Sequence, residues 1–148
     1  MSEVEALVKF RLAPLCTRRD IAMLGVIHRS VLGRGPPHFA KYIRLAERPH
    51  RGTRQSEHAH RMQVCSIIDG TQKAIARRSL LGLLDVYNLL PASVVERSAS
   101  VQCLQKVLQE LVTECAAAGT DGWQRLLSPR QEIYCHPLRA WRQWESHA

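Results

Sequence analysis

The acidic side chains of this chain do not supply the paired carboxylates that metal-dependent phosphoryl transfer or hydrolysis needs on a rigid element. The four aspartates are far apart and never adjacent, at Asp20, Asp69, Asp85 and Asp121. A phosphate-binding Walker loop, a GxGxxG motif and a GxSxG motif are also missing from the sequence. The residue types therefore form no constellation typical of an independent enzyme, and we expect no catalytic residue and no cofactor.

A group of histidines and a cysteine comes nearest to a metal site. His58-Ala59-His60 and Cys65 would supply three zinc ligands, but structural zinc sites prefer four, and the fourth would have to be His50 or a distant cysteine. The spacing matches no known finger pattern. Cys135-His136 lacks the two earlier cysteines of a retroviral-type knuckle. We predict no metal ligand and interpret the three histidines as solvated side chains of a basic loop.

The cysteines indicate reduced thiols rather than disulfides. The chain has 5 cysteines and no CxxC pair, whereas a secreted disulfide framework normally uses an even number. We expect Cys103 and Cys115 to be small buried residues on the apolar side of a helix. A nucleophilic thiol needs a histidine in contact. Nothing favours a pair such as Cys16 with His28, and we expect His28 to be partly buried within a helix.

The sequence contains no apolar segment long enough to cross a membrane, which takes about 18 consecutive apolar residues. Its first residues are acidic and lead into no long apolar run, so we expect no secretory signal. Together with the cysteine usage, these features predict an intracellular protein, nuclear or cytoplasmic, without a membrane partner.

Positive charge is concentrated in the first part of the chain. Residues 1–63 hold 12 Lys and Arg against 5 Asp and Glu, and residues 64–148 hold 9 against 8, so nearly all of the net charge of +8 lies in the first 63 residues. A local excess of this kind attracts polyanions, because each neutralised phosphate releases counterions. Charge alone leaves open both a polyanion-binding surface and a merely solvated one.

The segment 48–63 has no apolar periodicity, and we expect it to be a surface loop. Four of its residues are the candidate nucleic-acid-binding residues, namely Arg48, Arg51, Arg54 and Arg61. A guanidinium group can bind two phosphate oxygens at once. No aromatic residue is interleaved with these arginines, so contact would be to the phosphate backbone of RNA or DNA, without sequence preference. We predict no small-molecule ligand.

Helices must position these segments. Thr17 and Asp20 have the spacing of a capping box, which predicts a helix that starts at Thr17 and runs to Leu32. Gly33 and Gly35 would supply the positive φ of a helix exit, and the two prolines that follow forbid continuation.

A shorter second helix can open at these prolines, because proline suits a first helical turn. Its buried side would consist of Phe39, Tyr42, Ile43 and Ala46. The run Val64–Ile68 is short and apolar, which is compatible with a strand.

Two further helices follow in the second half of the chain. Thr71 can cap the first, whose broad apolar face ends at Pro91. Either Ser98 or Ser100 can cap the second, which is amphipathic and ends at Gly119.

These elements predict a mainly α fold, a small bundle of about four to five helices with a basic loop. We divide the chain into an N-terminal lead-in at 1–16, a helical domain at 17–127 with the basic loop at 48–63, and a Trp- and Arg-rich tail at 128–148. We expect the tail to be poorly ordered. Its Trp141-Arg142-Gln143-Trp144 segment combines stacking groups with charge, or else packs back on the core.

Five short motifs follow one another between about residues 12 and 117. In order they are Pro14-Leu15-Cys16-Thr17-Arg18-Arg19-Asp20-Ile21, Val31-Leu32-Gly33-Arg34-Gly35-Pro36-Pro37-His38-Phe39, Arg51-Gly52-Thr53-Arg54, Ala76-Arg77-Arg78-Ser79-Leu80 leading into Val86-Tyr87-Asn88-Leu89-Leu90-Pro91, and Ser98-Ala99-Ser100-Val101. This series resembles the C-terminal region, beyond the thumb, of non-LTR (LINE-type, jockey-like) retrotransposon reverse transcriptase polyproteins. Leu80 and Tyr87 depart from the family pattern, which has an aromatic residue and a tryptophan at these places.

The resemblance implies a fragment of an RNA-directed DNA polymerase from a mobile element. It implies no catalytic residue here, because the metal-binding aspartates of that family lie upstream of this region. RNA or DNA and the upstream polymerase domain are the implied partners. A second hypothesis stays open, a helical protein-interaction module or an inert relic of a mobile element, in which the faces around Leu83–Tyr87 and Leu104–Leu111 pack a core or dock a partner.

Overall fold

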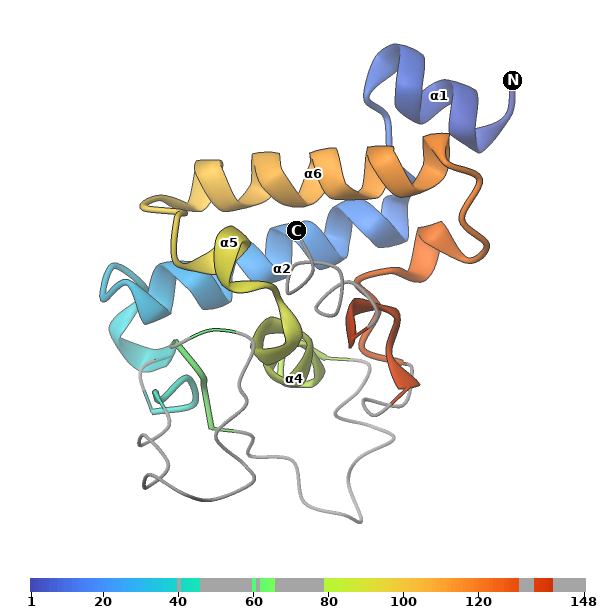
Figure 1. Cartoon of the computed structure of the whole chain (residues 1–148). Helices are drawn as coiled ribbons and strands as arrows, with labels where there is room; N and C mark the ends of the chain where they lie inside the picture. Colours follow the sequence, from blue (N-terminus) through green and yellow to red (C-terminus); the bar gives the residue numbers. More distant parts are fainter. Residues whose placement is uncertain (40, 46–59, 61, 66–78, 131–134, 140–148) are drawn as a thin grey trace.

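The computed structural model of the chain describes residues 1–39, 41–45, 60, 62–65, 79–130 and 135–139 (Figure 1). Helices dominate these residues, and no named strand occurs among them. The predicted mainly α fold is therefore confirmed. The basic loop lies almost wholly outside the described residues, together with its arginines Arg48, Arg51, Arg54 and Arg61.

Two long helices form the centre of the fold. α2 (Leu15–Val31) and α6 (Val101–Ala117) lie side by side and make the most extensive contact between helices (Figure 1). Gly25 of α2 lies at this contact, where an added Cβ would be only 3.1 Å from Cγ1 of Val101. The absence of a side chain at Gly25 therefore allows the two helices to approach closely.

α6 begins as the sequence predicts. Ser100 is its N-cap, and Ser100 Oγ accepts a hydrogen bond of 3.2 Å from the backbone N–H of Cys103. The apolar side of the helix is buried through Leu104, Leu108, Leu111, Val112 and Cys115. The predicted burial of Cys115 is confirmed, but that of Cys103 is wrong, since its side chain is exposed. Leu104 takes the inward position, and the preceding residue points about 100° away around the helix.

The N-cap of α2 lies three residues earlier than the sequence predicts, at Pro14 instead of Thr17. Leu15 is its first residue and Pro14 its N-cap, so Thr17 lies within the first turn. Proline suits this boundary because it has a fixed φ and lacks an N–H group. Thr17 Oγ1 donates instead to the backbone carbonyl of Gln124 at 3.0 Å. The predicted capping box of Thr17 and Asp20 is therefore wrong.

The exit of α2 uses its two glycines in different ways. Gly33 has a φ of 78°, the left-handed conformation that the sequence predicts. Gly35 is not in this conformation. An added Cβ at Gly35 would lie 2.8 Å from the backbone Cα of Ser30. Gly35 therefore serves a close approach of two backbone segments rather than a positive φ.

The predicted lead-in at 1–16 contains a helix, α1 (Glu3–Phe10). The side chains of Ser2 and Glu5 each accept a hydrogen bond from the backbone N–H of the other, a capping box. Arg11 has a φ of 55° and ends the helix. Leu7 is buried, and α1 contacts α6. Five large apolar side chains in and around α1 are nevertheless exposed, namely Met1, Val8, Phe10, Leu12 and Leu15.

α4 (Gly82–Leu89) and the short α5 (Ala92–Val95) complete the interior. Their inward side chains are buried, namely Leu83, Leu84, Val86, Tyr87, Leu89, Val94 and Val95. The faces around Leu83–Tyr87 and Leu104–Leu111 therefore pack the core and are not free to dock a partner. Thr71, the predicted cap of this helix, lies outside the described residues.

The predicted helix after the double proline is wrong in its length, because only the single 3₁₀ turn η1 (Pro37–Phe39) is formed. Ile43 is buried as predicted, but Tyr42 is exposed. Ala46 lies outside the described residues. After this turn the chain leaves the helical path and pairs with a later segment.

That later segment is held by a bridge and a side chain. Val64 forms an isolated antiparallel bridge with Leu45, and the rest of the predicted strand up to Ile68 lies outside the described residues beyond Cys65. Asn88 of α4 accepts from the backbone N–H of Val64 at 2.7 Å and donates to its carbonyl at 2.8 Å. The Asn88 amide thus takes the place of a second neighbouring strand.

The chain returns to the core after α6. η2 (Trp123–Arg125) follows the turn at Gly122, and Trp123 is buried. Within the predicted tail, Ser128, His136 and Leu138 are also buried, so the described part of this tail packs against the helices. Trp141 to Trp144 lie outside the described residues.

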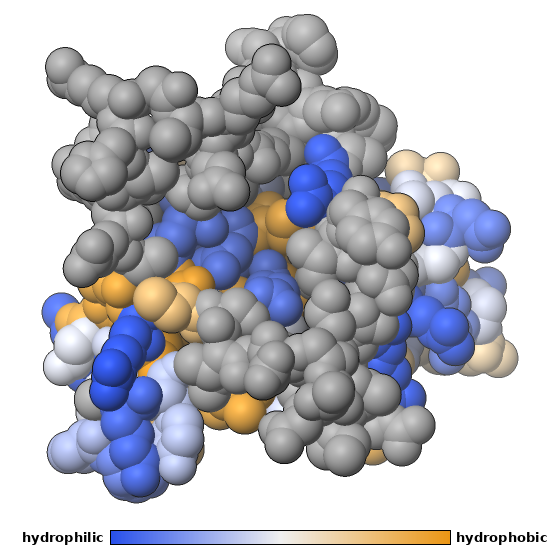
Figure 2. Space-filling view, turned by 90° about the horizontal axis from the view of Figure 1, so that it is seen from below, coloured by the Kyte–Doolittle hydropathy of each residue, from blue (hydrophilic) through white to orange (hydrophobic). Residues whose placement is uncertain are grey.

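Within the described residues, no helix has the length and apolar character needed to cross a membrane. Figure 2 views the molecule from below and shows hydrophilic and hydrophobic side chains next to one another on the visible part of that face.

Candidate functional site

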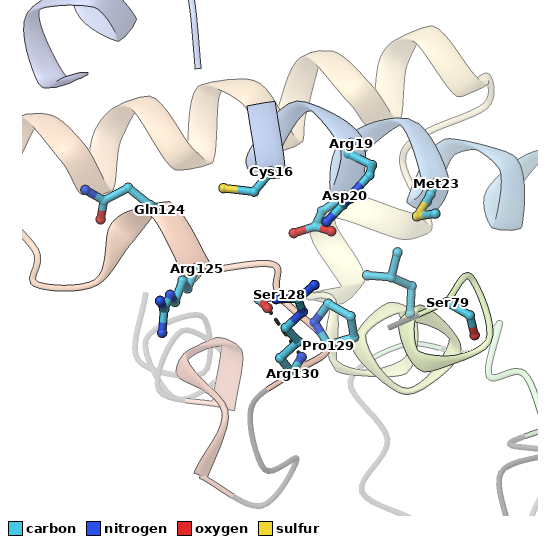
Figure 3. A pocket seen from close by; sticks show the side chains of 11 residues that line it. Cys16, Arg19, Asp20, Met23, Ser79, Gln124, Arg125, Ser128, Pro129 and Arg130 are labelled. Atoms are coloured by element: carbon cyan, nitrogen blue, oxygen red, sulfur yellow. Dashed lines mark hydrogen bonds between the residues drawn. The ribbon is translucent and has the colours of Figure 1, made fainter. Parts of the chain in front are cut away.

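A cavity of about 310 Å³ lies beside the N-terminal half of α2 (Figure 3). Three segments that are remote in sequence form its walls. α2 contributes Cys16, Arg19, Asp20 and Met23. The segment 124–130 forms the opposite wall, and Ser79 and Leu83 lie on the side of α4. The cavity therefore exists only in the folded chain.

Asp20 is the buried acid of this cavity. Its side chain is 7% exposed, and its carboxylate points toward the segment 124–130 in Figure 3. It forms no hydrogen bond and no direct ion pair with the part of the chain that the structure describes. Burial raises the pKa of Asp20 from 3.8 to about 6, although the charges of Arg19 and Arg130 act in the opposite direction. At neutral pH the carboxylate is therefore mostly ionised, and its oxygens are not among the fully buried atoms that lack a partner, so they remain open to the cavity.

Three arginines line the same cavity as this acid. Arg19 comes from α2, and Arg125 and Arg130 come from the opposite wall. All three side chains are exposed, and Asp20 is the one carboxylate among the described residues that line the cavity. Because a guanidinium group stays protonated at all relevant pH values, the described lining of the cavity holds more positive than negative charge. Guanidinium groups bind planar or tetrahedral anions through paired N–H donors.

Hydrogen bonds hold the segment 124–130 in place. At its start, the carbonyl of Gln124 accepts the bond from Thr17 of α2. At its end, the carbonyl of Ser128 accepts from Nε2 of His136 at 2.9 Å, and Ser128 Oγ accepts from the backbone N–H of Arg130 at 3.3 Å. Since the segment is anchored near both ends, the backbone that carries the two arginines has a fixed position.

Three buried histidines share one pattern of hydrogen bonds. In His28, His60 and His136 the Nε2–H group donates to a backbone carbonyl at distances of 2.7 to 2.9 Å. Because Nε2 donates, Nδ1 accepts, from the Tyr87 hydroxyl in His28 and from a backbone N–H in the other two. Burial lowers the pKa of His28 and of His136, so both rings are neutral. These rings stabilise the fold.

The interpretation of His60 as a solvated histidine is wrong. Its side chain is 3% exposed, and its ring contacts the Tyr87 ring edge-on at 5.2 Å. Both of its nitrogens are engaged with the backbone, so it cannot serve as the zinc ligand considered from the sequence. Among the described residues no three His, Cys, Asp or Glu side chains are grouped to hold a metal ion. His50 and His58 lie outside them.

The thiol of Cys16 lines the cavity and is exposed. Its Sγ lies 3.9 Å from Oγ1 of Thr17. His28 lies three turns further along the same helix and uses both ring nitrogens elsewhere. Cys16 and His28 therefore do not form a nucleophilic pair.

The candidate arginines of the basic loop are not among the residues whose placement is described, so their role stays a prediction. No family model matches this chain, and no curated protein or solved structure matches it either. Its function has to be inferred from its own residues.

The cavity was missed from the sequence because Asp20 was interpreted as a capping acid. A signal for its burial was present: Asp20, Leu24 and Ile27 stand at helical spacing, and all three are buried on one side of α2. An aspartate in line with a buried apolar face indicates a polar site at the core. Nothing in the local pattern of Arg125 or Arg130 indicates that they face it.

Proposed function

We propose that this chain is a non-catalytic helical domain that holds the phosphate backbone of RNA or DNA, within the C-terminal region of a retrotransposon RNA-directed DNA polymerase. The observation that carries the nucleic-acid part is that Arg19, Arg125 and Arg130 line the same cavity as one buried carboxylate. The series of motifs between about residues 12 and 117 supports the polymerase part. The upstream polymerase domain is the proposed partner, and the nucleus or cytoplasm the proposed location.

The mouth suits a nucleic-acid backbone better than a single anion. Its arginines come from two walls, so they present several donors over a width that a chain of phosphates can follow. The exposed side chain of Arg18 extends the positive charge along α2. The predicted arginines of the loop at 48–63 would add further phosphate contacts.

Anisotropy titrations with labelled single-stranded RNA and DNA test this function. Binding at low ionic strength should weaken steeply as salt is added, because phosphate contacts release counterions. The double variant Arg19→Ala/Arg130→Ala should bind about tenfold more weakly, with a salt slope reduced by about 2. A variant with alanine at Arg48, Arg51, Arg54 and Arg61 tests the loop separately.

Arg97→Ala is the matched control. Arg97 is exposed and stands next to Ser98, which contacts His28 near the other end of α2. Its removal takes away the same charge and should leave affinity within about twofold. Absence of binding at low salt, or equal loss in the control and the double variant, would contradict the proposed function.

A second candidate function is a protein-interaction module that pairs with a second copy of the chain through α1. The exposed apolar side chains around α1 favour it, in particular Val8, Phe10 and Leu12. α1 has Glu3 and Glu5 in its first turn and Lys9 in its last. Two antiparallel α1 helices would thus place acids opposite bases, a self-complementary contact. Sedimentation equilibrium tests it: a monomer at all concentrations, or a dimer unchanged in Phe10→Ser/Leu12→Ser, excludes this contact.

A further inference from the structure

We propose that the cavity beside α2 receives one nucleobase of a single-stranded RNA or DNA, and that the carboxylate of Asp20 binds the adjacent N–H groups of a guanine. This inference rests on the proposed nucleic-acid function and adds a base preference to it. In this arrangement the arginines at the mouth contact the phosphates that flank the bound nucleotide.

The Asp20 carboxylate suits a ligand that donates hydrogen bonds. Its side chain is 7% exposed, points into the cavity and has no hydrogen bond from the described residues. An ionised carboxylate can accept about four hydrogen bonds through its two oxygens. The Asp20 oxygens are not among the fully buried atoms that lack a partner, so they are accessible to a donor that enters the cavity. A phosphate in the same place would bring a second negative charge against the carboxylate. The cavity floor is therefore suited to N–H donors, and only its mouth to anions.

The walls suit a flat ring. Met23, Leu83 and Pro129 give the cavity apolar surfaces beside its polar groups. A volume of about 310 Å³ is at the lower end of small-ligand pockets, which is enough for one heteroaromatic base. Proteins that read single-stranded nucleic acid commonly splay a base out of the strand and bind its Watson–Crick edge in this way.

Guanine is the base whose edge fits a carboxylate best. Its ring N–H and its amino group lie next to each other, so they donate to the two oxygens of Asp20 in parallel. Adenine and cytosine offer one amino group next to a ring acceptor, which the carboxylate repels. Uracil and thymine offer one N–H between two carbonyl oxygens. The carboxylate therefore favours guanine over every other base.

The preference should depend on pH through Asp20. The charged and titratable groups around it are Arg19 and Cys16 on its own helix and Arg125 and Arg130 on the opposite wall. His136, behind that wall, is kept neutral by burial, which lowers its pKa. Protonation of Asp20 replaces one acceptor lone pair by a donor, so discrimination should weaken as the pH falls below about 6.

The test compares oligouridylates that differ at one central position, which carries G, A, C or U. A single guanine in a uridine background prevents self-association of guanine-rich strands. At pH 7.5 the full chain should bind the guanine oligonucleotide about tenfold more tightly than the all-uridine one, the value of one good bidentate contact. At pH 5 the difference should shrink to less than about threefold.

Asp20→Asn is the decisive variant, because an amide keeps the size of the side chain and offers only one acceptor oxygen. It should bind all four oligonucleotides about as tightly as the wild type binds the all-uridine one. Asp121→Asn, at an exposed position, is the matched control and should keep the guanine preference. Thermal unfolding of both variants checks that they are folded.

The outcomes separate the two proposals. Binding without a base preference, or a preference that survives Asp20→Asn, overturns the assignment of the cavity to guanine and leaves phosphate binding intact. No binding of any oligonucleotide at low salt overturns both.

Discussion

The two ends of α2 each carry a buried titratable side chain, and the surroundings of the two are opposite. His28, near the C-terminal end, is fully buried, and each of its ring nitrogens has a hydrogen-bond partner, Tyr87 on one side and Ser98 on the other. Asp20, near the N-terminal end, is 7% exposed, and no described residue gives it a hydrogen bond. Both side chains belong to one helix, and both are cut off from most of the solvent.

This comparison shows that burial of a polar group does not by itself indicate function. Where every donor and acceptor is matched, as around His28, the polar group fixes how α2 packs against its neighbours. Where a largely buried carboxylate faces a cavity and receives no hydrogen bond from the described residues, as at Asp20, its oxygens stay available to a ligand that donates hydrogen bonds. Substitutions at these two positions change how well the polar groups of each region are matched by partners.

Removal of the histidine should have the largest effect. His28→Ala leaves the Tyr87 hydroxyl and the Ser98 carbonyl buried without partners, which should lower the free energy of unfolding by about 3 kcal/mol. Urea denaturation measures this change. His38→Ala, at an exposed position, is the control and should cost less than about 0.5 kcal/mol. A loss below about 1 kcal/mol in His28→Ala would mean that its network does not hold the helices together.

Neutralisation of Asp20 should stabilise the fold, whereas removal of His28 should destabilise it. Asp20→Asn should raise the free energy of unfolding by about 2 kcal/mol at pH 7.5, because it removes an ionised group from a poorly solvated place. The folded pKa, about 6, lies above the ordinary value of 3.8. The contribution of Asp20 to stability is therefore complete below pH 4 and declines as the pH rises through about 6.

The measurement for Asp20 is the difference between wild type and Asp20→Asn in urea denaturation from pH 3.5 to 8. Other carboxylates cancel in this difference, and Asp121→Asn provides a reference at an exposed site. A difference that does not change with pH would show that Asp20 is as well solvated in the folded chain as in the unfolded one.

A smaller loss of stability is expected when the hydrogen bond between Thr17 and Gln124, which anchors one wall of the cavity, is removed. Thr17→Val removes the donor to the Gln124 carbonyl and should cost about 1 kcal/mol of stability. It should also reduce the guanine preference, because the segment 124–130 loses its anchor on α2. Thr113→Val is the control, since the hydroxyl of Thr113 bonds only to Gln109 of its own helix. Equal effects of the two substitutions on base preference would argue against a positioning role for Thr17.

The smallest effect is expected at the thiol. Cys16 lines the cavity, whereas Cys103 is exposed on α6. A bound guanine oligonucleotide should slow alkylation of Cys16 about threefold through reduced access, without change at Cys103. Peptide mass spectrometry after a short alkylation pulse reports both rates within one sample. Equal protection of the two thiols would indicate a general change of the chain rather than occupation of the cavity.

The sequence predicts the parts of this fold that depend on local spacing. The amphipathic pattern of α6, its cap at Ser100 and the exit of α2 at Gly33 are all formed as expected. α1 was not predicted, although the capping box of Ser2 and Glu5 and the helical spacing of Val4, Leu7 and Val8 are visible in the sequence, because the helix has only 8 residues. Local sequence patterns thus predict helices and their ends well where several such patterns occur together.

The site depends on contacts that no local pattern encodes. The bond between Thr17 and Gln124 joins residues 107 positions apart and holds the start of the segment 124–130 against α2. The burial of His60 depends in the same way on a residue remote in sequence, because its ring packs against Tyr87 of α4 and donates to the Tyr87 carbonyl. Sequence spacing could indicate that Asp20 is buried, but not that its neighbours would leave it without a donor.

The most direct test of the account is a carbon-detected NMR titration of the Asp20 carboxylate in the free chain and in the complex with the guanine oligonucleotide. We predict a pKa of about 6 in the free chain and a clear decrease when guanine N–H groups stabilise the ionised form. A pKa near the ordinary 3.8 in the free chain, or one that the oligonucleotide leaves unchanged, would contradict it.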